Sequence, residues 1–206
     1  MLALTLIEDR RLAMQVQHDP EEILDQALHA LSTDSDWRSV VDELPVPIYV
    51  TDPDGAVTYC NSACIEFSGH EPQLGKDRWC AALTMYTPTG EVMPHDQCPM
   101  AQALREKRIV RDIIVIAERL DGSRMAFRPY PTPLLDKDGS LTGAINMMID
   151  VTHEQSRSLH DQAERCRRLA GALYSRESTT VLHGMADGFE RTAAELGRRR
   201  DAVAED

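Results

Sequence analysis

Two kinds of hydrophobic spacing follow each other along the chain. Apolar residues recur every three to four positions between Pro20 and Leu44, and again after Thr152, which predicts helices. Between Pro45 and Asp150, β-branched residues gather in short runs that are separated by turn-forming residues, which predicts strands. The pattern therefore predicts a sheet-forming middle with helical segments on both sides.

The first helical segment carries clear end signals. "DPEEILDQALHALS" offers Asp19 as a cap, with proline and two acidic residues in the first turn. Its apolar positions fall on one face: Ile23, Leu24, Ala27, Leu28 and Leu31. A second, short helix, "SDWRSVVDEL", ends before Pro45.

A β-hairpin is predicted next, in "VPIYVTDPDGAVTYCN". Residues 47–51 and 56–60 form its strands, and Asp54-Gly55 supplies the turn. "NSACIEFSGH" then predicts a short helix that Asn61 caps and Gly69 ends. Residues 71–94 show no sustained period, so we expect irregular structure there, with one or two helical turns around residues 77–83.

Another short helix is predicted in "MPHDQCPMAQALREKR", residues 93–108. Asp96 can cap it, and Cys98 and Pro99 then fall in the first turn, where proline's missing donor costs little. Met100, Ala103 and Leu104 follow at helical spacing and are expected to face the sheet.

Three further strands are predicted in residues 109–120, 123–136 and 140–152, with turns at Asp121-Gly122 and Asp138-Gly139. Together with the hairpin they give an α+β class with one five-stranded, mainly antiparallel sheet. The chain after Thr152 is expected to form two helices that are broken near "YSREST".

Charge and cysteine content narrow the classes of function. The 34 acidic and 22 basic residues give a net charge of −12, which argues against binding to nucleic acid or to an anionic membrane. No apolar run is long enough to span a bilayer, and the opening residues lack the apolar core of a signal peptide, so we expect a cytoplasmic protein. The five cysteines include no CxxC pair, which favours neither a disulfide framework nor a structural zinc site.

The order of these elements resembles a PAS domain over residues 39–152. The resemblance is carried by "LPVPIYVTDPDGAVTYCNSACIEFSG" at the front and by "GSLTGAINMMIDVT" with an exit helix at the back. The middle resembles a bacterial subgroup with a D-x-C-P-M helix start, which is often found ahead of sensor histidine kinases. On this basis residues 1–38 are an N-terminal helical extension, and residues 153–206 are C-terminal helices for dimerisation or output.

The PAS resemblance implies a sensory or protein-interaction module whose sheet curls around a small cavity. Strand alternation and the facing helices predict the residues that line such a cavity. They are Ile48, Val50, Phe67, Met100, Leu104, Ile114, Ile116, Met125, Phe127, Tyr130, Ile145 and Met147. An apolar set this dense is first of all a core, so we predict no cofactor and leave open an unknown small ligand.

Catalysis at Cys98 is the weakest alternative. A helix N-terminus lowers a thiol pKa, but the charge of Asp96 opposes that shift, and no base is placed by the sequence unless His95 approaches. A buried packing role for Cys98 explains the same residues.

The sequence lacks the motifs by which PAS domains that bind haem or flavin hold their cofactors. Oxygen-sensing PAS domains use a histidine on the covering helix, whereas residues 97–108 contain none, and His70 and His95 fall in flanking segments. Light-sensing relatives carry an Asn-Cys-Arg-Phe-type motif that "DRWCAALTMY" does not match, so Cys80 is interpreted as structural. Haem binding stays an alternative to a purely protein-binding regulator.

The flanking helices are predicted to be the output surface. Their apolar stripes predict self-association through Leu24, Leu28, Leu31, Leu159, Cys166, Leu169, Leu173, Leu182, Met185 and Phe189. His153 and His160 lie outside a phosphoacceptor motif, and the chain after them is too short for an ATPase domain. We therefore expect a non-catalytic regulator that forms a homodimer and binds signalling proteins such as a histidine kinase or a response regulator.

Overall fold

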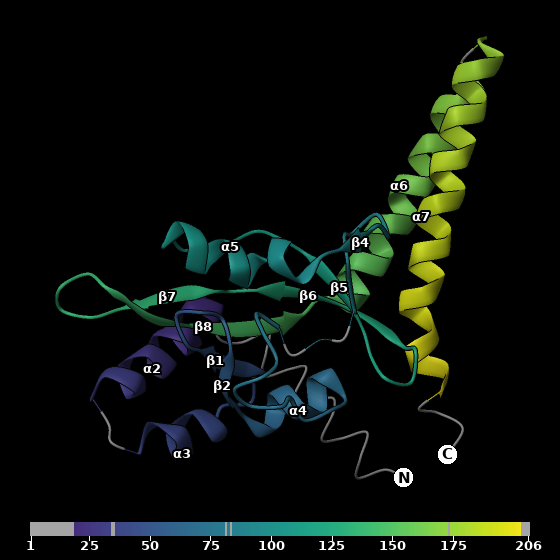
Figure 1. Ribbon diagram of the computed structural model, residues 1–206. Helices are drawn as coiled ribbons and strands as arrows, with labels where there is room; N and C mark the ends of the chain where they lie inside the picture. The colour runs from purple at the N-terminus through teal and green to yellow at the C-terminus, as the bar shows by residue number, and fades with distance from the viewer. Residues whose placement is uncertain (1–18, 34–35, 81, 83, 173, 203–206) are drawn as a thin grey trace. The chain divides into compact units, whose positions relative to one another are not determined.

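Antiparallel strands and short helices occupy the middle of the chain, and two long helices follow them (Figure 1). The structure is a computed structural model that describes residues 19–33, 36–80, 82, 84–172 and 174–202. It contains two units, which are described separately: residues up to 81 with 95–112 and 129–149, and residues 82–94 with 113–128 and those from 150 onward. The predicted α+β class is confirmed.

The first unit holds four antiparallel strands in the order β2-β1-β8-β7. Their bounds are β1 Ile48–Thr51, β2 Val57–Cys60, β7 Thr132–Leu135 and β8 Leu141–Asp150. The predicted hairpin is confirmed: Gly55 has a φ of 85°, and its N–H donates to the Asp52 carbonyl at 3.0 Å. The predicted turn at Gly139 is confirmed as well, with a φ of 77°.

The helices of the first unit are α2 Pro20–Thr33, α3 Trp37–Asp42, α4 Ser62–Ser68, the 3-10 turn His95–Gln97 and α5 Pro99–Glu106. The Asn61 side chain caps α4, and Gly69 ends it in the left-handed conformation, as predicted. The cap of α5 is a correction. Cys98, not Asp96, is its N-cap, because the extra 3-10 turn places Asp96 two residues too early.

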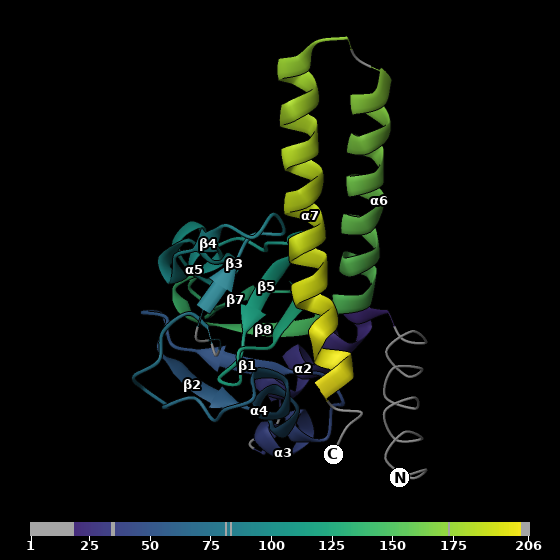
Figure 2. The same ribbon diagram turned by 90° about the vertical axis from the view of Figure 1, so that its right-hand side faces the viewer.

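The second unit holds antiparallel strands in the order β6-β5-β3-β4, and the two long helices. The elements are β3 Thr84–Tyr86, β4 Val92–Met93, β5 Val115–Glu118, β6 Arg124–Pro129, α6 Thr152–Ala172 and α7 Arg176–Ala202. The break that was predicted near "YSREST" lies between α6 and α7. Figure 2 shows these two helices side by side, with their connected ends directed away from β3 and β5.

The described residues form eight strands where five were predicted. Residues 123–136 form two strands, because Pro131 has no N–H to donate to a sheet. Residues 84–86 and 92–93 pair around a turn in which the Gly90 N–H donates to the Thr87 carbonyl at 2.9 Å. Helical turns around residues 77–83 were wrong for the described residues of that segment, whereas residues 81 and 83 lie outside the described part.

Strand β5 is shorter than predicted. It begins at Val115, because Asp112 adopts a φ of 61° and the chain before Val115 leaves the extended conformation. Val115, Ile116 and Ala117 are all buried, so this strand shows no alternation between an apolar and a polar face.

Helix α2 is part of the core of the first unit. Its buried residues Ile23, Leu24 and Ala27 pack in one cluster with Ile48, Val50, Tyr59, Tyr130, Ile145 and Met147 from the strand region. Glu21 fixes the helix further, because it accepts hydrogen bonds from Arg111 Nε at 2.7 Å and Nη2 at 3.2 Å. The apolar face of α2 is therefore covered by its own chain.

Candidate functional site

Strands β1 and β8 present different residues to their two faces. Ile48 pairs with Met147 and Val50 with Ile145, and these four belong to the cluster that packs on α2. Tyr49 pairs with Asn146 between them and points to the opposite face, because side chains alternate along a strand. In Figure 1, α2 and α5 lie on opposite sides of β8.

The face away from α2 carries a buried polar centre around Tyr49. The Tyr49 hydroxyl donates to the Trp79 carbonyl at 2.8 Å and accepts from Asn146 Nδ2 at 3.1 Å. Asn146 Oδ1 in turn accepts the Tyr130 N–H at 2.9 Å. These three hydrogen bonds link the Tyr49 hydroxyl, the Asn146 side chain, the Trp79 carbonyl and the Tyr130 N–H. The network therefore fixes the loop at Trp79 against the sheet.

Thiols surround the hydroxyl of Tyr49. Burial raises the pKa of Tyr49, and the neighbouring thiols of Cys80, Cys98 and Cys64 raise it further. The Cys98 thiol also reaches the Trp79 carbonyl, at 3.7 Å. All three cysteines are buried, so this part of the site is a thiol-rich interior around one phenol.

The surroundings of Cys98 do not favour a reactive thiolate. Burial raises its pKa, the N–H groups of Ala101 and Met100 lower it, and the charge of Asp96 raises it. The Ala101 N–H donates to Cys98 Sγ at 3.4 Å, which is the capping bond of α5. Cys98 is 2% exposed, in agreement with the buried packing role that the sequence favours.

The predicted cavity residues do not all lie on one face. Ile48, Val50, Tyr130, Ile145 and Met147 face α2, which corrects their placement opposite Met100 and Leu104 of α5. Met100 and Leu104 are buried on α5, and Phe67 is half-buried on α4. Ile116, Met125 and Phe127 are buried in strands of the second unit, and Ile114 is half-buried ahead of β5. The sequence-based prediction assigned the strand residues that face α2 to the face toward α5, because both faces of the strands are apolar.

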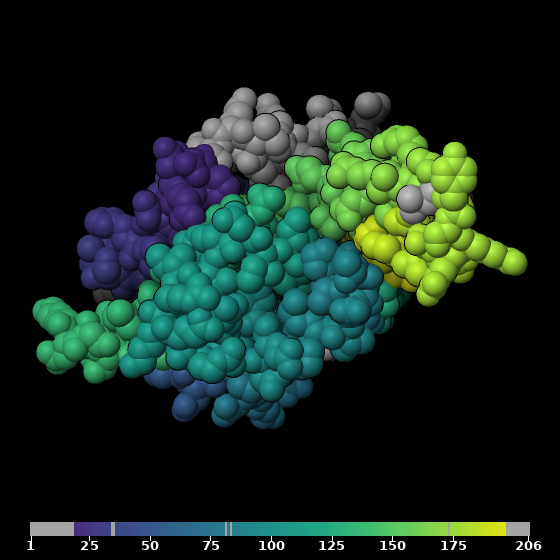
Figure 3. All heavy atoms as spheres, turned by 90° about the horizontal axis from the view of Figure 1, so that it is seen from above, coloured from purple at the N-terminus to yellow at the C-terminus, as the bar shows by residue number. Residues whose placement is uncertain are grey.

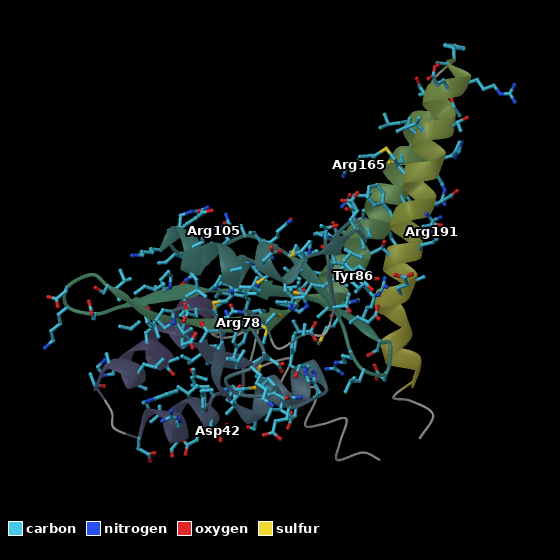
Figure 4. All side chains as sticks on the ribbon, in the orientation of Figure 1. Asp42, Arg78, Tyr86, Arg105, Arg165 and Arg191 are labelled. Carbon is cyan, nitrogen blue, oxygen red and sulfur yellow. The ribbon has the colours of Figure 1, made fainter. Side chains whose placement is uncertain are left out.

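The second unit has a charged centre at Arg124 in β6. Arg124 Nε donates to Glu118 Oε2 at 2.8 Å, its guanidinium lies 3.9 Å from the ring centroid of Tyr86, and Nη1 is bonded to Glu195 of α7. The Tyr86 hydroxyl donates to Glu118 at 2.8 Å. Figure 4 shows Tyr86 near the foot of the two long helices. This centre joins three strands to the far end of α7.

Contacts at one end of the helical pair, where α6 begins and α7 approaches its C-terminus, tie it to the strands of the second unit. The Val151 N–H donates to the Ala126 carbonyl at 2.9 Å, just before α6 starts, and Thr152 Oγ1 accepts the Ala126 N–H at 3.0 Å. At Gly90, in the turn between β3 and β4, a Cβ atom would lie 3.0 Å from Thr192 Oγ1 of α7. Both helices therefore contact the strands of the second unit directly.

The predicted interface residues differ in their exposure. Leu24 and Leu159 are each 1% exposed and Cys166 is buried, so none of these three is open to a partner; Leu28 and Leu31 pack against the cluster under α2. Leu182 and Phe189 are partly buried between α6 and α7, whereas Leu169 and Met185 are exposed. Leu173 lies outside the described residues.

Sequence reasoning missed Tyr49, Asn146, Arg111 and Arg124. A signal existed for the first two, because each is a polar residue inside an apolar strand, where it needs a hydrogen-bond partner. The two arginines make contacts with residues far along the chain, which no local pattern reveals.

Among the described residues, no three His, Cys, Asp or Glu side chains gather in a way that could hold a metal ion. Within the same residues, no helix combines the length and the apolar character that crossing a membrane requires.

Solved structures with a light-oxygen-voltage (LOV) domain are similar to this chain. An RNA-binding LOV receptor is 22% identical with a TM-score of 0.50, over 64% of this chain and 37% of that one. The LOV domain of a blue-light activated histidine kinase from Erythrobacter litoralis is 21% identical with a TM-score of 0.41, over 53% and 98%. A LOV protein from Rhodobacter sphaeroides is 12% identical with a TM-score of 0.44, over 89% and 99%. At these identities the likeness concerns the fold alone.

The family itself is shown by sequence. No curated protein matches the chain significantly. The sequence profile of the PAS fold, however, matches residues 41–156, which include the hairpin, the Tyr49 centre and the start of α6. The chain therefore belongs to the PAS fold family.

Proposed function

We propose that this chain is a non-catalytic, cytoplasmic PAS regulator that acts through protein–protein contacts in bacterial signal transduction. Its PAS domain, residues 39–152, lies between an N-terminal helical extension and C-terminal output helices. The observation that carries the proposal is the helical pair α6–α7, which is bonded to the PAS strands at Ala126 and Arg124 and exposes apolar side chains near its tip.

The helices α6 and α7 pack on each other mainly through small side chains. Ala163, Cys166 and Ala186 form their buried cluster, with Leu182 and Phe189 against it. Arg167 of α6 adds ion pairs to Glu190 and, at 3.6 Å, to Asp187 of α7. The pair therefore has its own core, and apolar residues outside that core are free for another partner.

Among the described residues, four exposed apolar side chains lie in the half of the pair toward the tip, and we call them the tip patch. They are Leu169, Tyr174, Val181 and Met185, with exposures of 52%, 107%, 57% and 47%. In Figure 3 the tip of the pair, where α6 ends and α7 begins, faces the viewer. Val181 and Met185 are four residues apart and therefore lie on one face of α7, and exposed apolar side chains that adjoin each other are typical of a protein–protein interface.

Glycines beside the tip patch support a close helix contact. Gly184 and Gly188 are four residues apart in α7, on the helix face of Val181 and Met185. A Cβ atom at Gly184 would meet no atom of the described chain within 4 Å, and a glycine inside a helix costs about 1 kcal/mol relative to alanine. A second helix that approaches Gly184 closely would recover that cost, so we propose that the partner is a second copy of this chain.

The experiment is light scattering over a range of protein concentrations. We expect a dimer for the wild type, and a monomer for the double variant Val181→Glu with Met185→Glu. Leu120→Glu, at an even more exposed apolar residue in the turn after β5, is the matched control and should remain dimeric. A monomer mass for the wild type at every concentration would overturn the homodimer.

The variant Gly184→Ala distinguishes the stability of helix α7 from the affinity of the proposed dimer interface. Alanine stabilises an isolated helix by about 1 kcal/mol relative to glycine. The variant should therefore unfold at a higher temperature at low protein concentration, where it is a monomer, and dissociate more readily than the wild type. An unchanged dimer affinity would show that the interface does not include Gly184.

The proposed partners beyond the second copy are a histidine kinase or a response regulator. The wild type should change the autophosphorylation rate of its partner kinase, and the double variant at the tip patch should not.

The rival proposal is a small-molecule or haem sensor, which native mass spectrometry and an absorption spectrum of the freshly purified protein would test. A stoichiometric added mass or a Soret band would favour that rival.

A further inference from the structure

Two cysteines of the first unit meet at one backbone carbonyl. Cys60 is the last residue of β2, and Cys64 lies in the first turn of α4. The Cys60 thiol donates to the Asn61 carbonyl at 3.6 Å, and the same oxygen accepts the Cys64 N–H at 3.0 Å. The Cys60 thiol is also the largest influence that raises the pKa of Cys64, which agrees with two neighbouring side chains that share this oxygen.

Asn61 holds this arrangement in place. Its Oδ1 accepts the N–H groups of Ile48 and Cys64, each at 2.9 Å. Its Nδ2 donates to the carbonyls of Val41, at 3.1 Å, and Val46, at 2.9 Å. Asn61 has 0% exposure, so the peptide that separates the two cysteines is fixed by four buried hydrogen bonds.

The two thiols differ in access to solvent. Cys60 is partly exposed, whereas Cys64 has 0% exposure. The hydrogen bond with Cys60 and burial both raise the pKa of Cys64, so Cys64 is not the thiol that reacts first. An oxidant from solvent therefore reaches Cys60 first, and Cys64 is placed to react with the product.

We propose that Cys60 and Cys64 form a peroxide-sensitive dithiol that closes to a disulfide. The Cys60 thiolate attacks one oxygen of hydrogen peroxide, the O–O bond breaks, and a sulfenic acid forms on Cys60 while water leaves. The Cys64 thiolate then attacks the Cys60 sulfur, the S–O bond breaks, and a second water leaves once protonated. Two thiols lose two electrons and two protons, and the peroxide is reduced to two water molecules.

The position of this dithiol gives oxidation a structural consequence. The disulfide would tie the end of β2 to the first turn of α4 across Asn61, whose side chain bonds the end of α3 at Val41 and the start of β1 at Ile48. Cys60 is also paired with Tyr49 in the hairpin. Oxidation therefore adds a covalent link beside the residues that hold Tyr49 in its position in β1.

The other three cysteines are all buried, whereas Cys60 is partly exposed, so an oxidant from solvent reaches Cys60 before them. Cys80 and Cys98 are buried, and Cys98 already uses its sulfur in the cap of α5. Cys166 lies in the small-residue core between α6 and α7. They serve as internal controls for the selectivity of oxidation.

The experiment is treatment of the folded, full-length protein with hydrogen peroxide, followed by alkylation in denaturant and tryptic mass mapping. Cys60 and Cys64 fall in one tryptic peptide, residues 39–76, which contains no other cysteine. We expect this peptide to lose two hydrogen atoms and to resist alkylation, while peptide 79–105, which carries both Cys80 and Cys98, and the peptide with Cys166 are alkylated. A thiol reductant should restore it.

Two variants test the order of the steps. Cys64→Ser should stop at a sulfenic acid on Cys60, which a dimedone probe captures, whereas Cys60→Ser should show neither sulfenic acid nor disulfide in this peptide. Cys166→Ser is the control and should form the disulfide as the wild type does. Circular dichroism confirms that each variant is folded.

The proposal fails if the peptide 39–76 is alkylated at both cysteines after peroxide treatment, or if another cysteine pair forms the disulfide. A sulfenic acid that persists on Cys60 in the wild type would also overturn it, because Cys64 would then not be in reach. The readout does not depend on dimer formation.

Discussion

Asn146 in β8 donates a 3.1 Å hydrogen bond to the hydroxyl of Tyr49 in β1, and both side chains are almost fully buried. The same hydroxyl donates to the Trp79 carbonyl, so one phenol joins two strands to the segment that follows α4. Because a buried donor or acceptor that loses its partner pays its full desolvation penalty, this hydroxyl is a point of high sensitivity.

Tyr49→Phe is therefore expected to destabilise the protein by about 1–3 kcal/mol, because it leaves the Asn146 amide and the Trp79 carbonyl each short of a partner. Urea unfolding measures the change. Tyr174→Phe removes the same hydroxyl from a fully exposed ring and should leave the stability within about 0.5 kcal/mol of the wild type. Equal effects at the two positions would contradict the buried network.

Gly143→Ala tests the close approach of β8 to β1. Gly143 has a φ of 155°, and a Cβ atom there would lie 2.1 Å from the Thr51 carbonyl oxygen. Since backbone cannot yield as a flexible side chain does, we expect a loss of at least about 2 kcal/mol in urea unfolding. Gly139→Ala, at a φ of 77° in open space, carries the strain of a positive φ without the clash, so it should cost distinctly less.

Local signals predicted the parts of the fold whose interactions are local. The cap at Asn61, the helix end at Gly69 and the turn at Gly55 each depend on one residue and its immediate neighbours. Strands β3 and β4, of three and two residues, are too short for a period to appear. They exist because β3 pairs with β5, which is distant along the chain.

The face of the sheet could not be predicted from alternation alone. Period two groups Ile48 with Val50 and Tyr49 with Thr51, but it does not say which group faces which helix. Strand β1 is buried at all four positions, so hydrophobicity did not separate the two faces either. The polar pair Tyr49 and Asn146 was the usable signal, since polar side chains in apolar strands mark the face where hydrogen-bond partners are available.

Leu24→Ala tests whether α2 belongs to the core or to an interface. Leu24 is 1% exposed in the cluster with Ile48 and Met147, so truncation should cost about 2–5 kcal/mol of unfolding free energy. Leu135→Ala, at a half-exposed leucine in β7, should cost much less. The dimer dissociation constant of folded Leu24→Ala should equal that of the wild type. A large rise in this constant would indicate that α2 is part of the dimer interface.

The charged centre at Arg124 predicts an acid-sensitive attachment of α7. Hydrogen bonds from Arg124 and Tyr86 lower the pKa of Glu118 below its usual range. Because the folded-state pKa is the lower one, the stabilisation is complete above the ordinary glutamate pKa of about 4.3 and is lost as the pH falls through the folded-state value. The side chains are partly exposed, so we expect no more than about 1 kcal/mol.

The unfolding free energy of Glu118→Gln should therefore decrease less than that of the wild type between neutral pH and pH values below about 4.3.

Hydrogen exchange should show earlier opening of α7 around Glu195 in Arg124→Gln, because this substitution removes the bond from β6 to α7. Asp161→Asn, which removes a carboxylate from the exposed face of α6, is the matched control for loss of charge. If Glu118→Gln and the wild type lose stability in parallel on acidification, Glu118 is not the group whose protonation releases the helix. The contact at Thr192 of α7 and the bond at Thr152 of α6 would then hold the helical pair instead.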